Sequence, residues 1–131
     1  MKKPGRVVLV PFPRADLTPG KLRPVLLLAR VPGPYEDWLV CMFSTKLQQA
    51  LPGFDEVIKS TASDFHSSGL RIPSVIRVAR LAVVSADMFM GTIGEISDER
   101  LHRIQKTLAD WIQSAGGTMS LKKSEVEKRQ S

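Results

Sequence analysis

The sequence predicts a small, mainly β domain, in which a curved antiparallel sheet or partly open barrel is covered by one C-terminal amphipathic helix. Its 131 residues fit one domain. The first two-thirds of the chain consists of short aliphatic and β-branched runs separated by turns rich in Pro and Gly. The hydrophobic period then changes once, near residue 97, to that of a helix. We assign the domain to residues 1–117.

Six extended segments are expected before that helix. Pro11 and Pro13 end the first, because proline cannot donate to a β-ladder, and Pro19-Gly20 predicts a turn in the loop that follows. The run PVLLLAR is continuously apolar, which indicates a central strand covered on both faces. In the fifth segment, residues 75, 77 and 79 are expected on one face and residues 76, 78 and 80 on the other. The expected strands are 6–12, 24–30, 38–44, 55–60, 74–84 and 91–96, with a helical turn over 86–90 that Ser85 caps.

The helix has clear boundaries. Ser97 is a good N-cap, and Gly116 and Gly117 end the helical pattern. One apolar stripe is expected to face the sheet, formed by Leu101, Ile104, Leu108, Trp111 and Ile112. His102 falls on the polar face and is expected in solvent. Residues 118–131 carry dense charge and few apolar side chains, which predicts a disordered tail.

Charge and cysteine content restrict the class of protein. A formal net charge of +6 and a pI near 9.8 favour anionic partners. Cys41 is the single cysteine, so no intrachain disulfide or cysteine metal cage forms, and its apolar surroundings predict a buried thiol in a reducing cytoplasm. The N-terminus lacks a signal-peptide pattern, and no apolar run approaches the length that spans a membrane.

The sequence lacks the motifs of several enzyme classes. His66 and His102 are far apart and have no metal-ligand spacing with acidic residues or Cys41. The chain contains no GxxxxGK[ST] or GxGxxG phosphate loop and no GxSxG nucleophile elbow. We therefore expect neither a metal nor a nucleotide cofactor.

Cations and hydroxyls gather instead at the predicted strand ends. If the fold brings these ends together they form a basic groove, because arginine offers paired donors that match phosphate oxygens and hydroxyls hold the same groups. The simpler alternative is that each lies at an ordinary solvated strand edge. The residues concerned are Arg23, Ser44, Thr45, Lys46, Arg71, Arg77 and Arg80.

Three stretches in order resemble the MazF/PemK-like toxins of bacterial toxin-antitoxin modules. They are GRVVLVPFPRADLTPGKLRPVLLLAR, VCMFSTK and SDFHSSGLRIPSVIRVARLAVVSADMFMGTIGEISDERL, and together they cover nearly all of residues 4–113. The resemblance implies an SH3-like β-barrel with a C-terminal helix, usually a homodimer. It also implies a metal-independent, sequence-specific endoribonuclease that cuts single-stranded RNA, including mRNA, by attack of the substrate 2′-hydroxyl on the adjacent phosphate.

The same resemblance implies roles for individual residues. Arg23 matches an arginine that stabilises charge at the phosphate, Ser44 a catalytic hydroxyl at a strand end, and Arg77 a second catalytic arginine. Contacts with RNA are expected from Thr18, Lys21, Thr45, Lys46, Arg71 and Arg80. The expected protein partner is an antitoxin, whose acidic or apolar segment competes with RNA for the basic groove.

The match departs from the family at two carboxylates. Ala79 takes the place of an aspartate, and Thr18 that of a glutamate found in some members. One interpretation is that Asp16, Asp64 or His66 accepts the 2′-hydroxyl proton; an imidazole titrates near neutral pH. A second is that Arg23 and another arginine perform the proton transfer more slowly. A third is a module that binds RNA or an antitoxin peptide without cutting.

Overall fold

The computed structural model describes residues 2–11 and 20–115. Its strands are β1 (Arg6–Pro11), β2 (Leu22–Arg30), β3 (Asp37–Ser44), β4 (Glu56–Ile58), β5 (Ser74–Ser85) and β6 (Thr92–Glu95). Its helices are the 3₁₀ turns η1 (Leu47–Gln49) and η2 (Ala86–Met88), the short α1 (Phe65–Ser68) and the long α2 (Asp98–Ser114).

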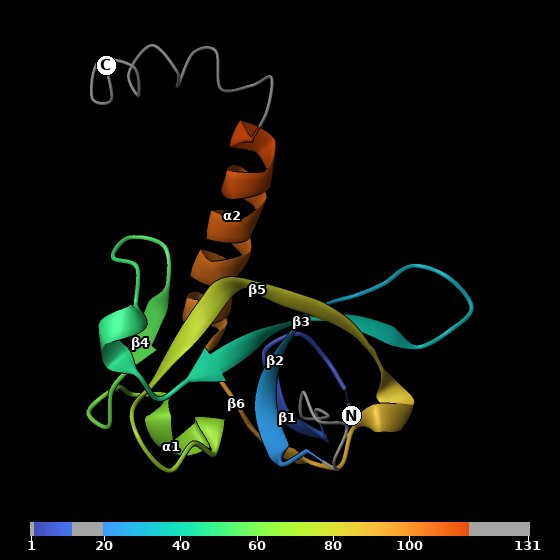
Figure 1. The fold of residues 1–131 in the computed structure, drawn as a ribbon, viewed down its shortest axis with the longest axis horizontal. Coiled ribbons are helices and arrows are strands. Elements are labelled where there is room, and N and C mark those ends of the chain that lie inside the picture. The colour runs from blue at the N-terminus through green and yellow to red at the C-terminus, as the bar shows by residue number, and fades with distance from the viewer. Residues whose placement is uncertain (1, 12–19, 116–131) are drawn as a thin grey trace.

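The six strands form one antiparallel sheet in the order β4-β5-β3-β2-β1-β6. The sheet curls into a half-barrel, and α2 rises from it at one side (Figure 1). The predicted fold class, a small antiparallel barrel-like sheet with a C-terminal helix, is therefore confirmed.

Each face of the sheet has its own hydrophobic cluster. Leu26 and Leu28 of β2 lie in the cluster that includes α2, whereas Val25 and Leu27 lie in the cluster on the opposite face. All four side chains are buried. The prediction of a central strand covered on both faces is confirmed, because strand alternation sends every second residue into a different core.

Several predicted boundaries need correction. β2 begins at Leu22 rather than residue 24, because its first residues pair with β1 as far as Pro11↔Leu22. β4 covers only Glu56–Ile58 of the expected 55–60. The expected loop 61–73 contains α1, which ends at Gly69 in the left-handed conformation (φ 78°) that glycine adopts without steric cost. Phe12, the predicted last residue of the first strand, lies outside the described residues.

Both predicted caps are confirmed, since the Ser97 and Ser85 hydroxyls accept hydrogen bonds from the Arg100 and Asp87 amides. The apolar stripe of α2 is only partly as predicted. Leu101, Ile104 and Leu108 are buried against the sheet.

Trp111 and Ile112 are 42% and 58% exposed. The last turn of α2 lies beyond the sheet (Figure 1). Among the aromatic rings of the described residues, the Trp111 ring contacts only that of Phe54, edge-on, with 5.9 Å between the ring centres. The expected tail 118–131 lies outside the described residues. Within the described ranges, no helix is long and apolar enough to cross a membrane.

Candidate functional site

Strand register places Arg23, Ser44 and Arg77 on one face of the sheet. Val25 of β2 pairs with Met42 of β3, and Met42 pairs with Arg77 of β5. Directly paired residues share a face, as do residues two apart on one strand. Arg23 is two residues from Val25, and Ser44 two from Met42, so neighbouring strands bring together three residues that are widely separated in the sequence.

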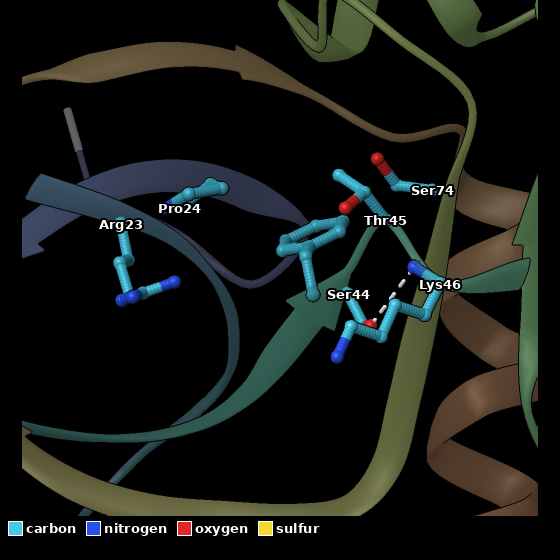
Figure 2. A pocket seen from close by; sticks show the side chains of 7 residues that line it. Arg23, Pro24, Ser44, Thr45, Lys46 and Ser74 are labelled. Carbon is cyan, nitrogen blue, oxygen red and sulfur yellow. Dashed lines mark hydrogen bonds between the residues drawn. The ribbon is translucent and has the colours of Figure 1, made fainter. Parts of the chain in front are cut away.

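A pocket of about 250 Å³ opens where β2 begins, β3 ends and β5 begins. In Figure 2, Arg23 and Pro24 lie on one side of it, across from Ser44, Thr45 and Lys46. The Lys46 amide donates to the Ser44 hydroxyl oxygen at 3.1 Å, which turns the chain sharply after the strand. Phe43 and Ser74 complete the lining.

A second pocket adjoins the first and shares Phe43 and Ser44 with it. Met42, Gln49, Arg77 and Arg80 supply the remaining walls. The cationic residues of the two pockets, together with the two hydroxyl-bearing residues at the end of β3, form a set that we call the basic groove: Arg23, Ser44, Thr45, Lys46, Arg77 and Arg80. Six of the residues expected to act on or hold an anion therefore lie along one surface.

A bulge in β5 shapes this surface. Cys41 pairs with Leu81, but the next residue, Met42, pairs with Arg77, so residues 78–80 have no partner on β3. The predicted regular alternation is wrong here: Val78 is buried, whereas Ala79 and Arg80 are both exposed. A bulge re-aims side chains in this way, and here it turns Arg80 outward beside Arg77.

Arg77 is fixed from two sides. Its Nε lies 3.2 Å from Oδ2 of Asp55, and its Nη1 donates to Oε1 of Gln49 at 3.1 Å. Ser44 Oγ donates to the same Gln49 oxygen at 3.3 Å. One short network therefore joins the second arginine of the basic groove to its serine.

The charge of the basic groove is largely unneutralised. No aspartate or glutamate is among the described residues that line its two pockets. Arg23 is exposed, and its side chain has no salt bridge or hydrogen-bond partner among the described residues. An arginine without an internal partner beside a hydroxyl and a second, oriented arginine is suited to bind phosphate oxygens.

Two of the expected proton acceptors lie outside the basic groove. Asp64 is buried, and Arg100 donates to its carboxylate from Nε at 2.8 Å and from Nη2 at 3.2 Å. Burial alone raises the pKa of Asp64, but the hydrogen bonds from Arg100 and the Ser97 amide, with the Arg100 charge, lower it below its usual value. His66 is exposed on α1 and packs its ring edge-on against Phe65.

The remaining candidates are divided between described and undescribed parts of the chain. Asp16 and Thr18 lie outside the described residues. Lys21 is exposed immediately before β2, close in sequence to Arg23. Arg71 is exposed between α1 and β5 and lines neither pocket of the basic groove. His102 is exposed, as predicted.

Sequence reasoning missed four residues of this region: Phe43, Gln49, Asp55 and Ser74. Phe43 was detectable as the neighbour of Ser44 at a strand end. The roles of Gln49 and Asp55 carry no local signal, because Arg77, the partner that they share, lies 28 and 22 residues away along the chain. Ser74 is buried and donates its hydroxyl to the Ile72 carbonyl, so it holds the start of β5.

The family model described as "PemK-like, MazF-like toxin of type II toxin-antitoxin system" matches residues 3–112. The matched range includes every residue of the basic groove. No curated protein matches the chain.

Proposed function

The chain belongs to the PemK-like, MazF-like toxins of type II toxin-antitoxin systems, and from this premise we propose that it is an endoribonuclease that cuts single-stranded RNA in the basic groove. The observation that carries the proposal is the placement of Arg23, Ser44 and Arg77 on one face of the sheet. No carboxylate is among the described residues that line the two pockets there. Membership of the family implies an antitoxin partner and a dimer as the typical assembly.

The reaction requires charge stabilisation above all. The 2′-oxygen of one nucleotide attacks the adjacent phosphorus, and the bond from phosphorus to the 5′-oxygen breaks, which leaves a 2′,3′-cyclic phosphate and a 5′-hydroxyl. Negative charge accumulates on the phosphoryl oxygens in between. Arg23 and Arg77 stabilise that charge from two strands, and the Ser44 hydroxyl supplies a further donor when it turns from Gln49 Oε1 to the phosphate.

A base must also take the 2′-hydroxyl proton, and a general acid or water must protonate the leaving 5′-oxygen. Asp64 is poorly suited, because Arg100 and Ser97 occupy its carboxylate. His66 lines neither pocket of the basic groove. We therefore retain Asp16, seven residues before Arg23, as the candidate proton acceptor.

Purified protein is expected to cut single-stranded RNA in EDTA and to leave ends that polynucleotide kinase labels without prior phosphatase treatment. The 2′-hydroxyl is the nucleophile, so an RNA with a single 2′-deoxy substitution at the mapped cleavage site serves as the matched control and should stay intact. Intact RNA across varied sequences at high protein concentration would contradict the proposal.

A second candidate function is binding without cleavage. It is favoured by the lack of any carboxylate or histidine among the described residues that line the two pockets, and by Ala79 at the position where the resemblance expects an aspartate. In the same assay this function predicts saturable, salt-sensitive RNA binding with no product, because phosphate contacts weaken as salt rises.

We further propose that the antitoxin covers the basic groove with an acidic segment. The exposed Arg23, Lys46 and Arg80 offer it the charges that RNA would otherwise use. Saturating antitoxin is therefore expected to stop cleavage and to displace bound RNA. Unchanged cleavage by the antitoxin-bound protein would show that the two ligands use different surfaces.

Since the proposed substrate is mRNA, the toxin is expected to act in the cytoplasm.

A further inference from the structure

The Asp55 carboxylate is nearly buried, accepts hydrogen bonds from two backbone amides and forms an ion pair with Arg77. Its side chain is 4% exposed. Oδ2 accepts from the Leu51 amide at 3.0 Å and lies 3.2 Å from Nε of Arg77, while Oδ1 accepts from the Val78 amide at 3.0 Å. A buried carboxylate is costly unless it is paired and hydrogen-bonded, so this arrangement is a built feature of the fold.

The Val78 amide is the informative donor. It belongs to the first of the three residues that the β5 bulge leaves without a partner on β3. A buried amide without an acceptor destabilises a fold, and Asp55 supplies the acceptor from the segment before β4. The same carboxylate therefore stabilises the bulge backbone and the side chain of the residue just before it, Arg77.

Gln49 completes the arrangement from the other side. Its Oε1 accepts from Arg77 Nη1 and from Ser44 Oγ. Two different groups of the Arg77 guanidinium are therefore held by two different segments, which leaves the remaining N–H groups to a ligand. An arginine fixed at Nε and Nη1 has lost most of its rotational freedom before any ligand binds, and such preorganisation is what charge stabilisation in a reaction requires.

We infer that Asp55 and Gln49 are positioning residues for RNA cleavage, which clamp the β5 bulge and aim the Arg77 guanidinium into the basic groove. The inference rests on the proposed function for its kinetic part only. The placement of Arg77 by Asp55 is a property of the protein alone, and it can be measured without RNA.

The kinetic test is a double-mutant cycle in single-turnover RNA cleavage, with Asp55→Asn, Arg77→Ala and the double variant. Asn keeps a carbonyl oxygen for the Val78 amide but presents no charge to Arg77. A misplacement of about 1 Å reduces rates by about 100-fold, so Asp55→Asn is expected to lose about that factor, with KM little changed. If Asp55 acts through Arg77, Asp55→Asn causes no further loss of cleavage rate in the Arg77→Ala background. An equal loss in both backgrounds would overturn the inference.

Glu56→Gln is the matched control. Glu56 is the next residue, but its carboxylate accepts from Arg100 and Arg103 of α2, away from the basic groove. This variant is expected to lower stability and leave the cleavage rate unchanged. Should Asp55→Asn fold poorly, Gln49→Ala tests the same network. Gln49 is exposed, so its replacement is expected to leave the fold intact. It is expected to lose about 10-fold in rate, and full activity would count against the network.

The second readout is the Arg77 Nε–H signal in ¹H–¹⁵N spectra, assigned by its loss in Arg77→Lys. The Arg77 Nε lies 3.2 Å from the buried Asp55 carboxylate. In the unmodified chain its proton is expected to exchange slowly with water, and in Asp55→Asn much faster. An unchanged exchange rate would overturn the inference even if the protein cuts RNA. Conversely, if the unmodified chain cuts no RNA, the proposed nuclease function fails while this signal still decides whether Asp55 places Arg77.

Discussion

Two nearly buried ionisable side chains, Asp55 and Cys41, are held in opposite ways. Asp55 is paired with donors, as described above. Cys41 of β3 is fully buried in the apolar cluster on the α2 face of the sheet, and no side chain in the described part of the chain hydrogen-bonds its sulfur to stabilise a thiolate. Burial, and then the negative charge of Asp55, raise the pKa of Cys41 from 9.0 to about 12. The thiol is therefore a core group and not a nucleophile.

Cys41 is expected to resist thiolate-directed reagents at pH 8 in the folded protein and to react rapidly in guanidinium chloride. Because the folded pKa is raised, the neutral thiol contributes stability that is complete below about pH 9 and is lost as pH rises towards 12. Labelling kinetics under both conditions check this. Stoichiometric labelling of protein with an intact circular dichroism spectrum would contradict it.

At the level of single residues, the sequence predicted what depends on strand position and motif. Arg23 and Ser44 follow from their places at the start and end of apolar runs, and both line the pocket. Asp64 and His66 were proposed from residue chemistry alone. Their environments are set by contacts with α2 and within α1, which no local pattern reveals.

Among the elements, an ion-pair cluster fixes the N-terminal end of α2. Arg100 bonds Asp64 beside α1 and Glu56 of β4, and Arg103 shares the Glu56 carboxylate. Asp64 also accepts from the Ser97 amide at 3.0 Å, which satisfies the backbone at the helix start. This cluster holds three elements that are far apart in the sequence.

Asp64→Asn is expected to destabilise the fold by about 3 kcal/mol at pH 7, because it leaves Arg100 without one of its buried partners. Since the folded pKa of Asp64 is lowered, its contribution is complete above its unfolded pKa of about 3.9 and is lost as pH falls through the folded value. The stability gap between the two proteins should therefore narrow in acid. Urea unfolding at pH 7 and pH 3 measures it.

Asp110→Asn is the control for this prediction, because Asp110 makes an exposed pair with Lys106. Exposed pairs contribute about 0 to 1 kcal/mol, so this variant should change little at either pH. Equal effects of the two substitutions would contradict a structural role specific to Asp64.

Sequence patterns predicted the strands and the N-caps of α2 and η2, because those depend on local alternation and on short-range hydrogen bonds. They did not predict α1, η1 or the β5 bulge. The bulge arises where a backbone amide finds its acceptor on Asp55, a contact across 23 residues. The exposure of Trp111 was also missed, because periodicity indicates a face of the helix but not how far the sheet extends beneath it.

For the whole molecule, the positive charges behind the net charge of +6 are unevenly distributed. Many acidic side chains are engaged within the fold, as with Asp55, Asp64 and Glu56, whereas Arg23, Lys46 and Arg80 stay exposed along one surface. A sheet that curls brings the ends of β2, β3 and β5 to that surface (Figure 1). An anionic polymer is the ligand that such a surface suits.

The central claim is that the basic groove cuts RNA, and Arg23→Ala compared with Arg30→Ala in single-turnover cleavage in EDTA tests it most directly. Both arginines are exposed on β2, but Arg30 pairs with Trp38 at the opposite end of the strand from the groove. Loss of one donor to the developing charge costs about 100- to 1,000-fold, so Arg23→Ala is expected to lose about that factor with unchanged melting temperature, while Arg30→Ala keeps its rate. Equal rates for the two variants would contradict the account.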